Sequence, residues 1–140
     1  MVKTSCSIGA LELKNRVFVA SGTFGYGDEC LDIVDVNLLG GIITKSLSLN
    51  PRDGNPPRRI YETPGGMLNS IGLANIVVKR FIAEKLPFLR TLNTIVIANI
   101  AASTIDEYCA VLDQLEPEEG IDGYEINVSC PNVREGGLTF

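Results

Sequence analysis

Histidine is absent from the 140-residue chain. The chain therefore cannot supply a Ser-His-Asp triad, a Cys-His pair or a histidine metal site. Proton transfer by its own side chains must use cysteine, lysine, tyrosine or a carboxylate. None of the four cysteines (Cys6, Cys30, Cys109 and Cys130) forms the Cys-x-x-Cys pair of a zinc knuckle or a thioredoxin-type site. We expect no metal site and reduced thiols.

Long apolar runs and an excess of basic residues are also absent. The longest apolar stretch, TIVIANIAA at 94–102, is too short to span a bilayer and contains Asn99. The N-terminal segment lacks the continuous apolar core of a signal peptide. The net charge is −5 and the pI is about 4.7, which argues against nucleic acid or an anionic membrane as a partner. We expect a cytoplasmic protein that binds neither.

The composition, 45% hydrophobic and 21% charged, indicates one globular domain over 1–140. A short hairpin is predicted at 6–15, followed by strands at 16–22, 41–46, 94–100 and 123–129. Helices are predicted at 28–40, at 75–89 with an end near Pro87, and at 103–117 with Ser103 as the N-cap. Residues 48–66 are rich in proline and glycine and predict a long ordered loop with room for one hairpin.

The alternation of strands and helices predicts parallel strands with helical crossovers. Both the doubly wound sheet and the (β/α)8 barrel have this order. A dinucleotide-binding sheet shows G-x-G-x-x-G after its first strand, whereas Gly22, Gly25 and Gly27 have a different spacing. A barrel instead places its chemistry at the C-terminal ends of several strands. Those ends fall here at 20–22, 44–46, 98–99 and 127–130.

A lysine, two asparagines and a cysteine stand at these strand ends. Each has an ordinary structural interpretation: Lys45 as a solvated lysine, Asn99 and Asn127 as turn formers, and Cys130 as a small buried hydrophobe. Their coincidence at the same end of successive strands favours one shared site.

The chain resembles the class 1 dihydroorotate dehydrogenases over essentially its whole length. The segments that carry the resemblance are ASG at 20–22, TKSLS at 44–48, PRDGNPPRR at 51–59, GMLNSIGLAN at 66–75, IANIA at 97–101 and INVSCPNV at 126–133. Enzymes of this class are FMN-dependent (β/α)8 barrels that oxidise dihydroorotate in de novo pyrimidine (UMP) synthesis. The GMLNSIGLAN segment is more similar to the NAD-linked 1B type than to the fumarate-linked 1A type.

The resemblance assigns a role to individual residues. It makes Cys130 the catalytic base that takes a proton from C5 of dihydroorotate while a hydride passes from C6 to FMN. It assigns substrate binding to Lys45, Asn69, Ser70, Ile71, Gly72, Leu73, Asn127 and Asn132. It assigns FMN binding to Ser21, Gly22, Lys45, Ser46, Asn99 and Asn127. Arg52 and Arg59 match arginines of the family, with a supporting role or a solvated loop position left open.

The 1B resemblance also implies partners. These are an electron-transfer subunit with FAD and a [2Fe-2S] cluster that passes electrons to NAD, and a homodimeric core or a heterotetramer. A full barrel needs about 250 residues, and this chain ends in the loop after Cys130. The expected fold class is therefore α/β, the N-terminal half of a (β/α)8 TIM barrel preceded by a short hairpin.

Two further interpretations stay open. One is another FMN barrel that acts on pyrimidines, similar to dihydropyrimidine dehydrogenase. The other is a non-catalytic half-barrel that serves as an interaction module. In a half-barrel the remaining flavin contacts and the phosphate site belong to the other half, so we expect this chain alone to bind FMN weakly or not at all.

Overall fold

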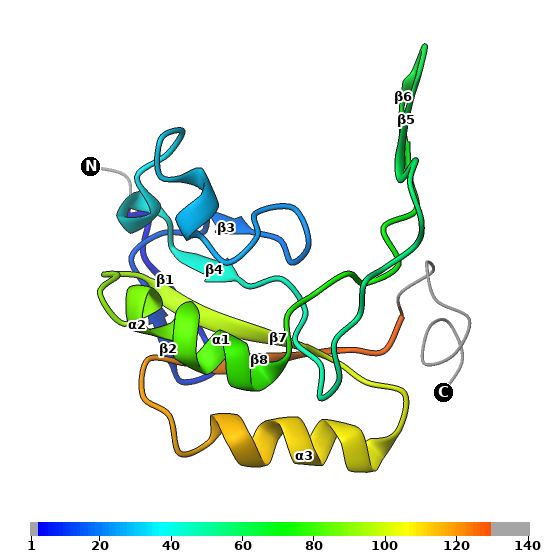
Figure 1. Cartoon of the computed structure of the whole chain (residues 1–140). Coiled ribbons are helices and arrows are strands. Elements are labelled where there is room, and N and C mark those ends of the chain that lie inside the picture. Colours follow the sequence, from blue (N-terminus) through cyan, green and yellow to red (C-terminus); the bar gives the residue numbers. More distant parts are fainter. Residues whose placement is uncertain (1–2, 130–140) are drawn as a thin grey trace.

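The computed structural model describes residues 3–129, and its centre is a four-stranded parallel sheet. The strands are β3 (Phe18–Val19), β4 (Gly41–Ile43), β7 (Ile95–Ala101) and β8 (Gly123–Asn127). They lie side by side in that order, and every neighbouring pair is parallel. The predicted parallel sheet is therefore confirmed, and Figure 1 shows its successive strands running in one direction.

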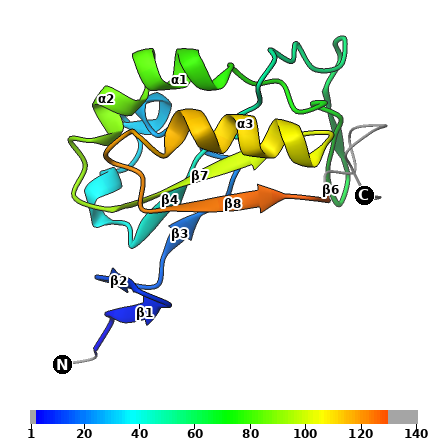
Figure 2. The same cartoon turned by 90° about the horizontal axis from the view of Figure 1, so that it is seen from below.

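Helices cover one face of this sheet (Figure 2). They are α1 (Val78–Glu84), α2 (Leu86–Leu89) and α3 (Ile105–Leu115). The core lies between the helices and the sheet, where Phe81 and Val111 pack with Ile100 and are fully buried. The central strand β7 is buried on both faces, as expected for a parallel strand with neighbours on each side.

Two antiparallel hairpins flank the sheet. The first joins β1 (Cys6–Ile8) to β2 (Leu11–Leu13) through a turn at Gly9, whose φ of +57° favours glycine. The second joins β5 (Ile60–Thr63) to β6 (Gly66–Asn69) and rises away from the body of the molecule (Figure 1). The hairpin predicted at 6–15 is thus present, and the second hairpin begins within the loop predicted at 48–66 but extends beyond it to Asn69.

The helix predicted at 28–40 is wrong. Only two short 3-10 helices form there, η1 (Asp28–Cys30) and η2 (Val36–Leu38), and Ile33 between them is 84% exposed. Leu31, Val34 and Leu38 fall at the i, i+3 and i+7 positions of one helix face, but Asp35 occupies i+4. Leu31 and Leu38 are 50% and 69% exposed, so this face is not buried against the core. The Asp35 carboxylate also accepts a hydrogen bond from Asn37 N at 2.9 Å, which favours a local turn over a continuous helix.

Two other helix boundaries differ from the prediction. The 75–89 segment begins its helix at Val78 and breaks at Lys85, and Pro87 lies in the first turn of α2 instead of ending α1. Proline is tolerated there because the first turn has no intrahelical use for its N–H. The N-cap of α3 is Thr104 and not Ser103, since the Thr104 hydroxyl accepts from Glu107 N at 3.2 Å.

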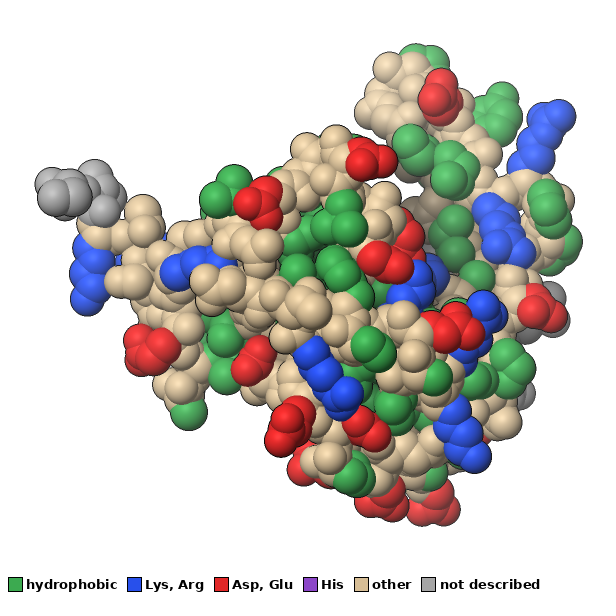
Figure 3. All heavy atoms as spheres, turned by 60° about the vertical axis from the view of Figure 1, so that its left-hand side comes forward, with side chains coloured by type: hydrophobic (Ala, Val, Ile, Leu, Met, Phe, Trp, Pro, Cys, Tyr) green, Lys and Arg blue, Asp and Glu red, His purple; other side chains and the backbone are tan. Residues whose placement is uncertain are grey.

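The surface of the described chain is mixed in charge. The face in Figure 3 shows acidic and basic side chains interspersed among polar and apolar ones. No helix within residues 3–129 is long and apolar enough to cross a bilayer.

Gly40 offers a direct test of how the chain before β4 packs against the chain before β3. A Cβ on Gly40 would lie 2.0 Å from the backbone oxygen of Asn15, so Gly40→Ala must push two backbone segments apart. We expect the free energy of unfolding, measured by urea titration, to fall by about 1–3 kcal/mol. Gly65→Ala is the matched control because a Cβ there meets nothing within 4 Å. Equal urea midpoints for the two variants would contradict the packing described here.

Candidate functional site

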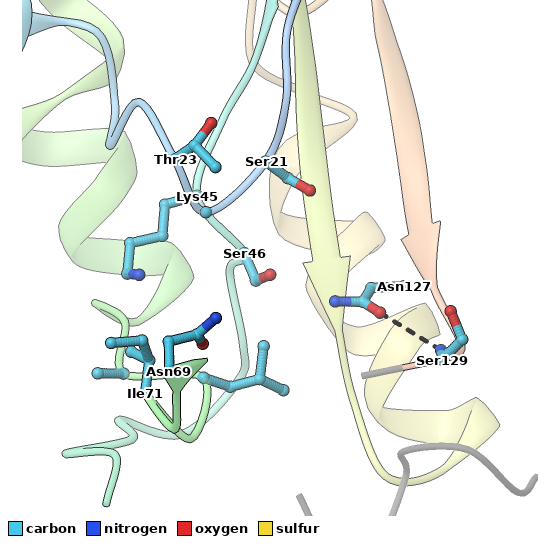
Figure 4. A pocket seen from close by; sticks show the side chains of 11 residues that line it. Ser21, Thr23, Lys45, Ser46, Asn69, Ile71, Asn127 and Ser129 are labelled. Atoms are coloured by element: carbon cyan, nitrogen blue, oxygen red, sulfur yellow. Dashed lines mark hydrogen bonds between the residues drawn. The ribbon is translucent and has the colours of Figure 1, made fainter. Parts of the chain in front are cut away.

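An open pocket of about 350 Å³ lies at the C-terminal ends of the parallel strands (Figure 4). Four chain segments contribute: the loop after β3, the residues after β4, the end of β8, and the segment from the end of β6 onward. The lining residues are Ser21, Gly22, Thr23, Lys45, Ser46, Asn69, Ile71, Leu73, Ala74, Asn127 and Ser129. In Figure 4 the Ser46 and Asn127 side chains point toward one another across this space.

Most of the predicted site residues within the described chain meet in this pocket. Those that line it are Ser21, Gly22, Lys45, Ser46, Asn69, Ile71, Leu73 and Asn127. Three others, Ser70, Gly72 and Asn99, do not line it. Cys130 and Asn132 lie outside the described residues, although Ser129, the residue before Cys130, is part of the lining. The structure thus brings these side chains together, and their chemical roles stay predictions.

Lys45 is the cation of this pocket. Its backbone N–H donates to Gly25 O at 2.8 Å, which fixes where the side chain begins. Its amino group has no hydrogen-bond or ion-pair partner among residues 3–129, and none of the described lining residues is acidic. A cation without a neighbouring carboxylate makes the pocket attractive to an anionic ligand.

Asn99 lies deeper than the prediction placed it. Strand β7 continues for two residues beyond Asn99, to Ala101, so the side chain is only 1% exposed and stays within the sheet. Its amide nitrogen donates to the Glu125 carboxylate on the paired strand, in a short contact. Its oxygen Oδ1 has no partner among the described residues. A buried amide oxygen without a donor is costly, so Asn99 retains one site for a hydrogen bond from a ligand or water.

Ser70 and Gly72 are turned toward Asn55 and away from the pocket. Asn55 Nδ2 donates to Ser70 Oγ at 2.8 Å, and Asn55 N donates to Ile71 O at 3.0 Å. Gly72 has φ +75°, and a Cβ on it would lie 2.7 Å from Asn55 N. Contact with Asn55 therefore shapes the backbone on one side and leaves Asn69, Ile71 and Leu73 facing the pocket. Asn55 was not among the site residues predicted from the sequence.

Three other pocket-lining residues were not predicted, and the two arginines named in the prediction lie outside the pocket. Thr23, Ala74 and Ser129 line the pocket without having been predicted, although Ser129 stands within the quoted INVSCPNV segment. Arg52 donates to Ser103 Oγ at 3.1 Å, and Arg59 donates to the carbonyls of Asn55 and Asp53. Both arginines therefore bind parts of the protein near the loop and do not line the pocket.

The remaining cysteines lie away from this site. Cys6 and Cys30 are half-buried, Cys109 is exposed, and all three are free thiols. Among residues 3–129, no group of three or more cysteine or acidic side chains is placed to hold a metal ion. Within the part of the chain that the structure describes, the chemistry available at the pocket is thus one amine, several hydroxyls and amides, and an apolar wall.

Together, the sheet and the pocket define part of a (β/α)8 barrel whose polar site lies at the C-terminal strand ends. The family model described as dihydroorotate dehydrogenase matches residues 2–140. The chain belongs to the dihydroorotate dehydrogenase family.

Its relatives include proteins named dihydroorotate dehydrogenase B (NAD(+)), catalytic subunit. The chain is 52% identical over 136 residues to the one from Geotalea uraniireducens, covering 97% of this chain and 45% of that protein. It is 53% identical over 133 residues to the one from Thermoanaerobacter pseudethanolicus, covering 95% and 44%. The chain therefore spans about half the length of the curated relatives it matches.

A solved structure confirms the fold. It is the Eimeria tenella DHODH in complex with ferulenol, with a TM-score of 0.78 over 94% of this chain and 38% of that one. The sequence identity of 18% limits this likeness to the fold. The predicted half of a TIM barrel is thus confirmed by the arrangement of strands and helices.

The contact between Asn55 and the 70–72 segment can be tested by substitution. Asn55→Ala removes the hydrogen bonds to Ser70 while leaving the backbone bond to Ile71. We expect faster amide hydrogen exchange across 69–74 and a loss of about 1 kcal/mol in the free energy of unfolding. Asn50→Ala is the control, since the exposed Asn50 side chain makes no hydrogen bond within the described residues. Unchanged exchange at 69–74 in Asn55→Ala would show that the segment holds its shape without Asn55.

Proposed function

We propose that the chain forms the N-terminal half of the catalytic subunit of an NAD-linked dihydroorotate dehydrogenase, which oxidises dihydroorotate to orotate in pyrimidine synthesis. The observation that carries this proposal is the meeting of Lys45, Asn69 and Asn127 at one strand-end pocket. The relatives named above, at 52% and 53% identity, support the same activity.

The pocket chemistry suits a carboxylated pyrimidine. Dihydroorotate and orotate carry one carboxylate and a ring edge on which C=O and N–H groups alternate. Lys45 supplies a cation for the negative charge, and no described lining carboxylate competes for it. The amides of Asn69 and Asn127, with Asn132 proposed to join them, both donate and accept hydrogen bonds, as such an edge requires. Ile71 and Leu73 at the pocket wall complete the proposed substrate site. Ser70 and Gly72, which face Asn55, belong to it in this proposal only through their backbone.

The residues present also fit FMN. The buried Oδ1 of Asn99 is an acceptor without a partner in the described chain, and Ser21 and Ser46 add hydroxyls at the pocket wall. Gly22 has φ +80°, and a Cβ there meets nothing within 4 Å, so the loop after β3 leaves space beside it. FMN would be held by Ser21, Gly22, Lys45, Ser46, Asn99 and Asn127. When bound, FMN supplies the hydride acceptor of the reaction.

Cys130 is the proposed base. A thiol has an unperturbed pKa of about 8.5, which is closer to neutral pH than that of a carboxylic acid and suits removal of a proton from a weak carbon acid. The chain has no histidine to compete for this role. Ser129 at the pocket wall precedes Cys130 directly in the sequence. Cys130 takes the C5 proton, and the Lys45 cation offsets negative charge that develops in the site.

The names of the relatives extend the proposal to partners. A protein named as a catalytic subunit belongs to an assembly with at least one other subunit. We propose that the partner carries FAD and a [2Fe-2S] cluster and delivers electrons to NAD, in a heterotetramer around a homodimeric core. A cytoplasmic location is part of the same proposal.

Replacing Cys130 tests the chemistry in the complete enzyme, meaning this chain together with the C-terminal half that its relatives carry. Cys130→Ala should lower the rate of orotate formation by about 10²–10⁴-fold near neutral pH while flavin stays bound. Cys130→Ser should keep a small activity that rises in alkali, because a serine hydroxyl is a weaker acid than a thiol. Orotate absorbance and flavin absorbance are the two measurements.

Cys109→Ser is the control for Cys130, because Cys109 is an exposed thiol on α3. It should retain near-wild-type turnover. Full activity in Cys130→Ala would remove Cys130 as the base. A wild-type protein that binds flavin but oxidises another dihydropyrimidine would favour the dihydropyrimidine dehydrogenase-like alternative. A protein with neither flavin nor turnover would favour the interaction module.

Replacing Lys45 tests the electrostatic part of the proposal. Lys45→Ala removes the cation of the pocket, so both substrate binding and flavin reduction should weaken, the latter on the order of 10²-fold. Stopped-flow measurement of flavin bleaching by dihydroorotate reports both effects. Lys79→Ala, at an exposed position on α1, should leave both unchanged. Near-normal flavin reduction in Lys45→Ala would favour the ordinary interpretation of Lys45 as a solvated lysine at a strand end.

A further inference from the structure

An ion cluster lies behind the loop that delivers residues 21–23 to the pocket. Lys85, at the end of α1, donates to Asp28 Oδ2 at 2.7 Å and lies 3.5 Å from Glu29 Oε1. Asp28 and Glu29 belong to η1, which directly follows the loop. None of the three lines the pocket, and the proposed reaction gives none of them a role. This cluster of Lys85, Asp28 and Glu29 is called the clamp below.

The clamp acts on the loop through its backbone. Glu29 Oε2 accepts from Tyr26 N at 2.9 Å, so the same carboxylate that approaches Lys85 also holds the loop. Gly25 has φ +61°, and a Cβ on it would lie 2.6 Å from Glu29 Oε2, so the carboxylate fills the bend of the chain at this glycine. The clamp therefore contacts the loop backbone directly at Gly25.

The bend at Gly25 is also hydrogen-bonded to Lys45, the cation of the pocket. Gly25 O accepts the backbone N–H of Lys45 at 2.8 Å, so the loop and the chain after β4 are joined at this point. On the core side, the Tyr26 ring lies 5.7 Å from the Phe81 ring, and Lys85 Nζ lies 5.7 Å from the centre of the Tyr26 ring. A displacement of the bend would therefore move both the 21–23 wall and the start of the Lys45 side chain.

We propose that Lys85 is a positioning residue: through Asp28 and Glu29 it holds the loop after β3 so that residues 21–23 and Lys45 meet the ligand in one fixed arrangement. The ligand in question is FMN, so this inference rests on the proposed function. Lys85 stands at the end of α1, whereas the residues that it positions follow β3 and β4. Helix α1 thus takes part in cofactor binding without contacting the pocket.

The setting of the pair is suited to this role. The Lys85 and Asp28 side chains are 21% and 33% exposed, so they are shielded from water more than ordinary surface ion pairs. The hydrogen bond to Asp28 raises the pKa of Lys85 above 10.5. Partial burial raises the pKa of Asp28, but the hydrogen bond from Lys85 and its positive charge outweigh this and hold the pKa of Asp28 below its ordinary value. Both groups are therefore charged at neutral pH, and the clamp is closed there.

Helix α1 supplies its own matched control. Arg80 pairs with Glu84 at 2.8 Å, but these side chains are 60% and 49% exposed and belong to one helix. Arg80→Met removes a cation and an ion pair from α1 without touching the loop after β3. Lys85→Met removes a cation of the same charge five residues further along the chain, where the ion-pair partner, Asp28, directly follows the loop.

The test measures FMN affinity in the complete enzyme by quenching of flavin fluorescence, at a temperature where circular dichroism shows each variant folded. Lys85→Met should raise the FMN dissociation constant about tenfold, while Lys85→Arg should stay within about threefold of wild type because it restores the cation. Arg80→Met should leave the constant unchanged. Asp28→Asn should act like Lys85→Met, and the double variant should be no worse than either single one.

Amide hydrogen exchange over 20–27 is the second readout, and it needs no cofactor. Exchange should speed up in Lys85→Met and Asp28→Asn and stay as in wild type in Arg80→Met. If Lys85→Met does not fold, Asp28→Asn decides. A wild-type dissociation constant in a folded Lys85→Met protein would overturn the inference, as would equal losses in Lys85→Met and Lys85→Arg. If the wild-type protein binds no FMN, the proposed function fails, and unchanged exchange at 20–27 would independently refute the clamp.

Discussion

The main-chain pairing of β7 with its two neighbours is the constraint on which the site depends. Beyond the end of β4, Thr44 N donates to Ile97 O, Leu47 N donates to Asn99 O, and Ala101 N donates to Leu47 O, each at 2.8–2.9 Å. The chain from 44 to 47 is therefore held against β7 by backbone hydrogen bonds, in which its side chains take no part. Lys45 and Ser46 are fixed in place by this ladder and need no side-chain contacts of their own. Their side chains stay available for a ligand.

The electrostatic character of the site differs from that of the whole chain. The chain carries a net charge of −5, yet the described pocket wall includes Lys45 and no acid. Glu125, an acidic residue on β8, is bonded to Asn99 on the neighbouring strand. Local arrangement, and not overall charge, sets the preference of this pocket for an anion. The net charge of the chain therefore does not indicate the local charge of this pocket.

The sequence predicted the elements with strong periodicity and failed where local contacts compete. Strand β7 and helix α3 were found within a few residues because Tyr108, Val111 and Leu115 recur on one buried helix face and β7 is apolar apart from Asn99. The segment from 28 to 40 has a similar spacing at Leu31, Val34 and Leu38, but Leu31 and Leu38 are exposed and Asp35 bonds its own turn. The conformation of such segments depends on tertiary packing, which a short-range sequence pattern does not reveal.

The pocket was predictable to the extent that it follows the strand ends. The rule that parallel strands present their C-terminal ends together, with the quoted motifs, brought Ser21, Lys45, Ser46 and Asn127 into one place. It did not bring Asn99 to the pocket wall, because β7 continues two residues beyond Asn99, to Ala101, and keeps the Asn99 side chain inside the sheet. It also failed for Asn55, whose role depends on a contact with a segment fifteen positions away.

The β1–β2 hairpin lies at the opposite end of the sheet from the pocket. Glu12 and Lys14 border the residues that begin the strands, near Gly40, Ile95 and Asp122, and Figure 2 shows the arrows of β7 and β8 pointing away from this hairpin. Lys14 donates to the carbonyls of Asn37 and Asn93, so the hairpin is joined to the sheet and does not hang free. A molecule attached to a sensor surface through this hairpin would present its pocket to the solution. Immobilisation at that end thus gives a uniform orientation with the ligand entrance uncovered.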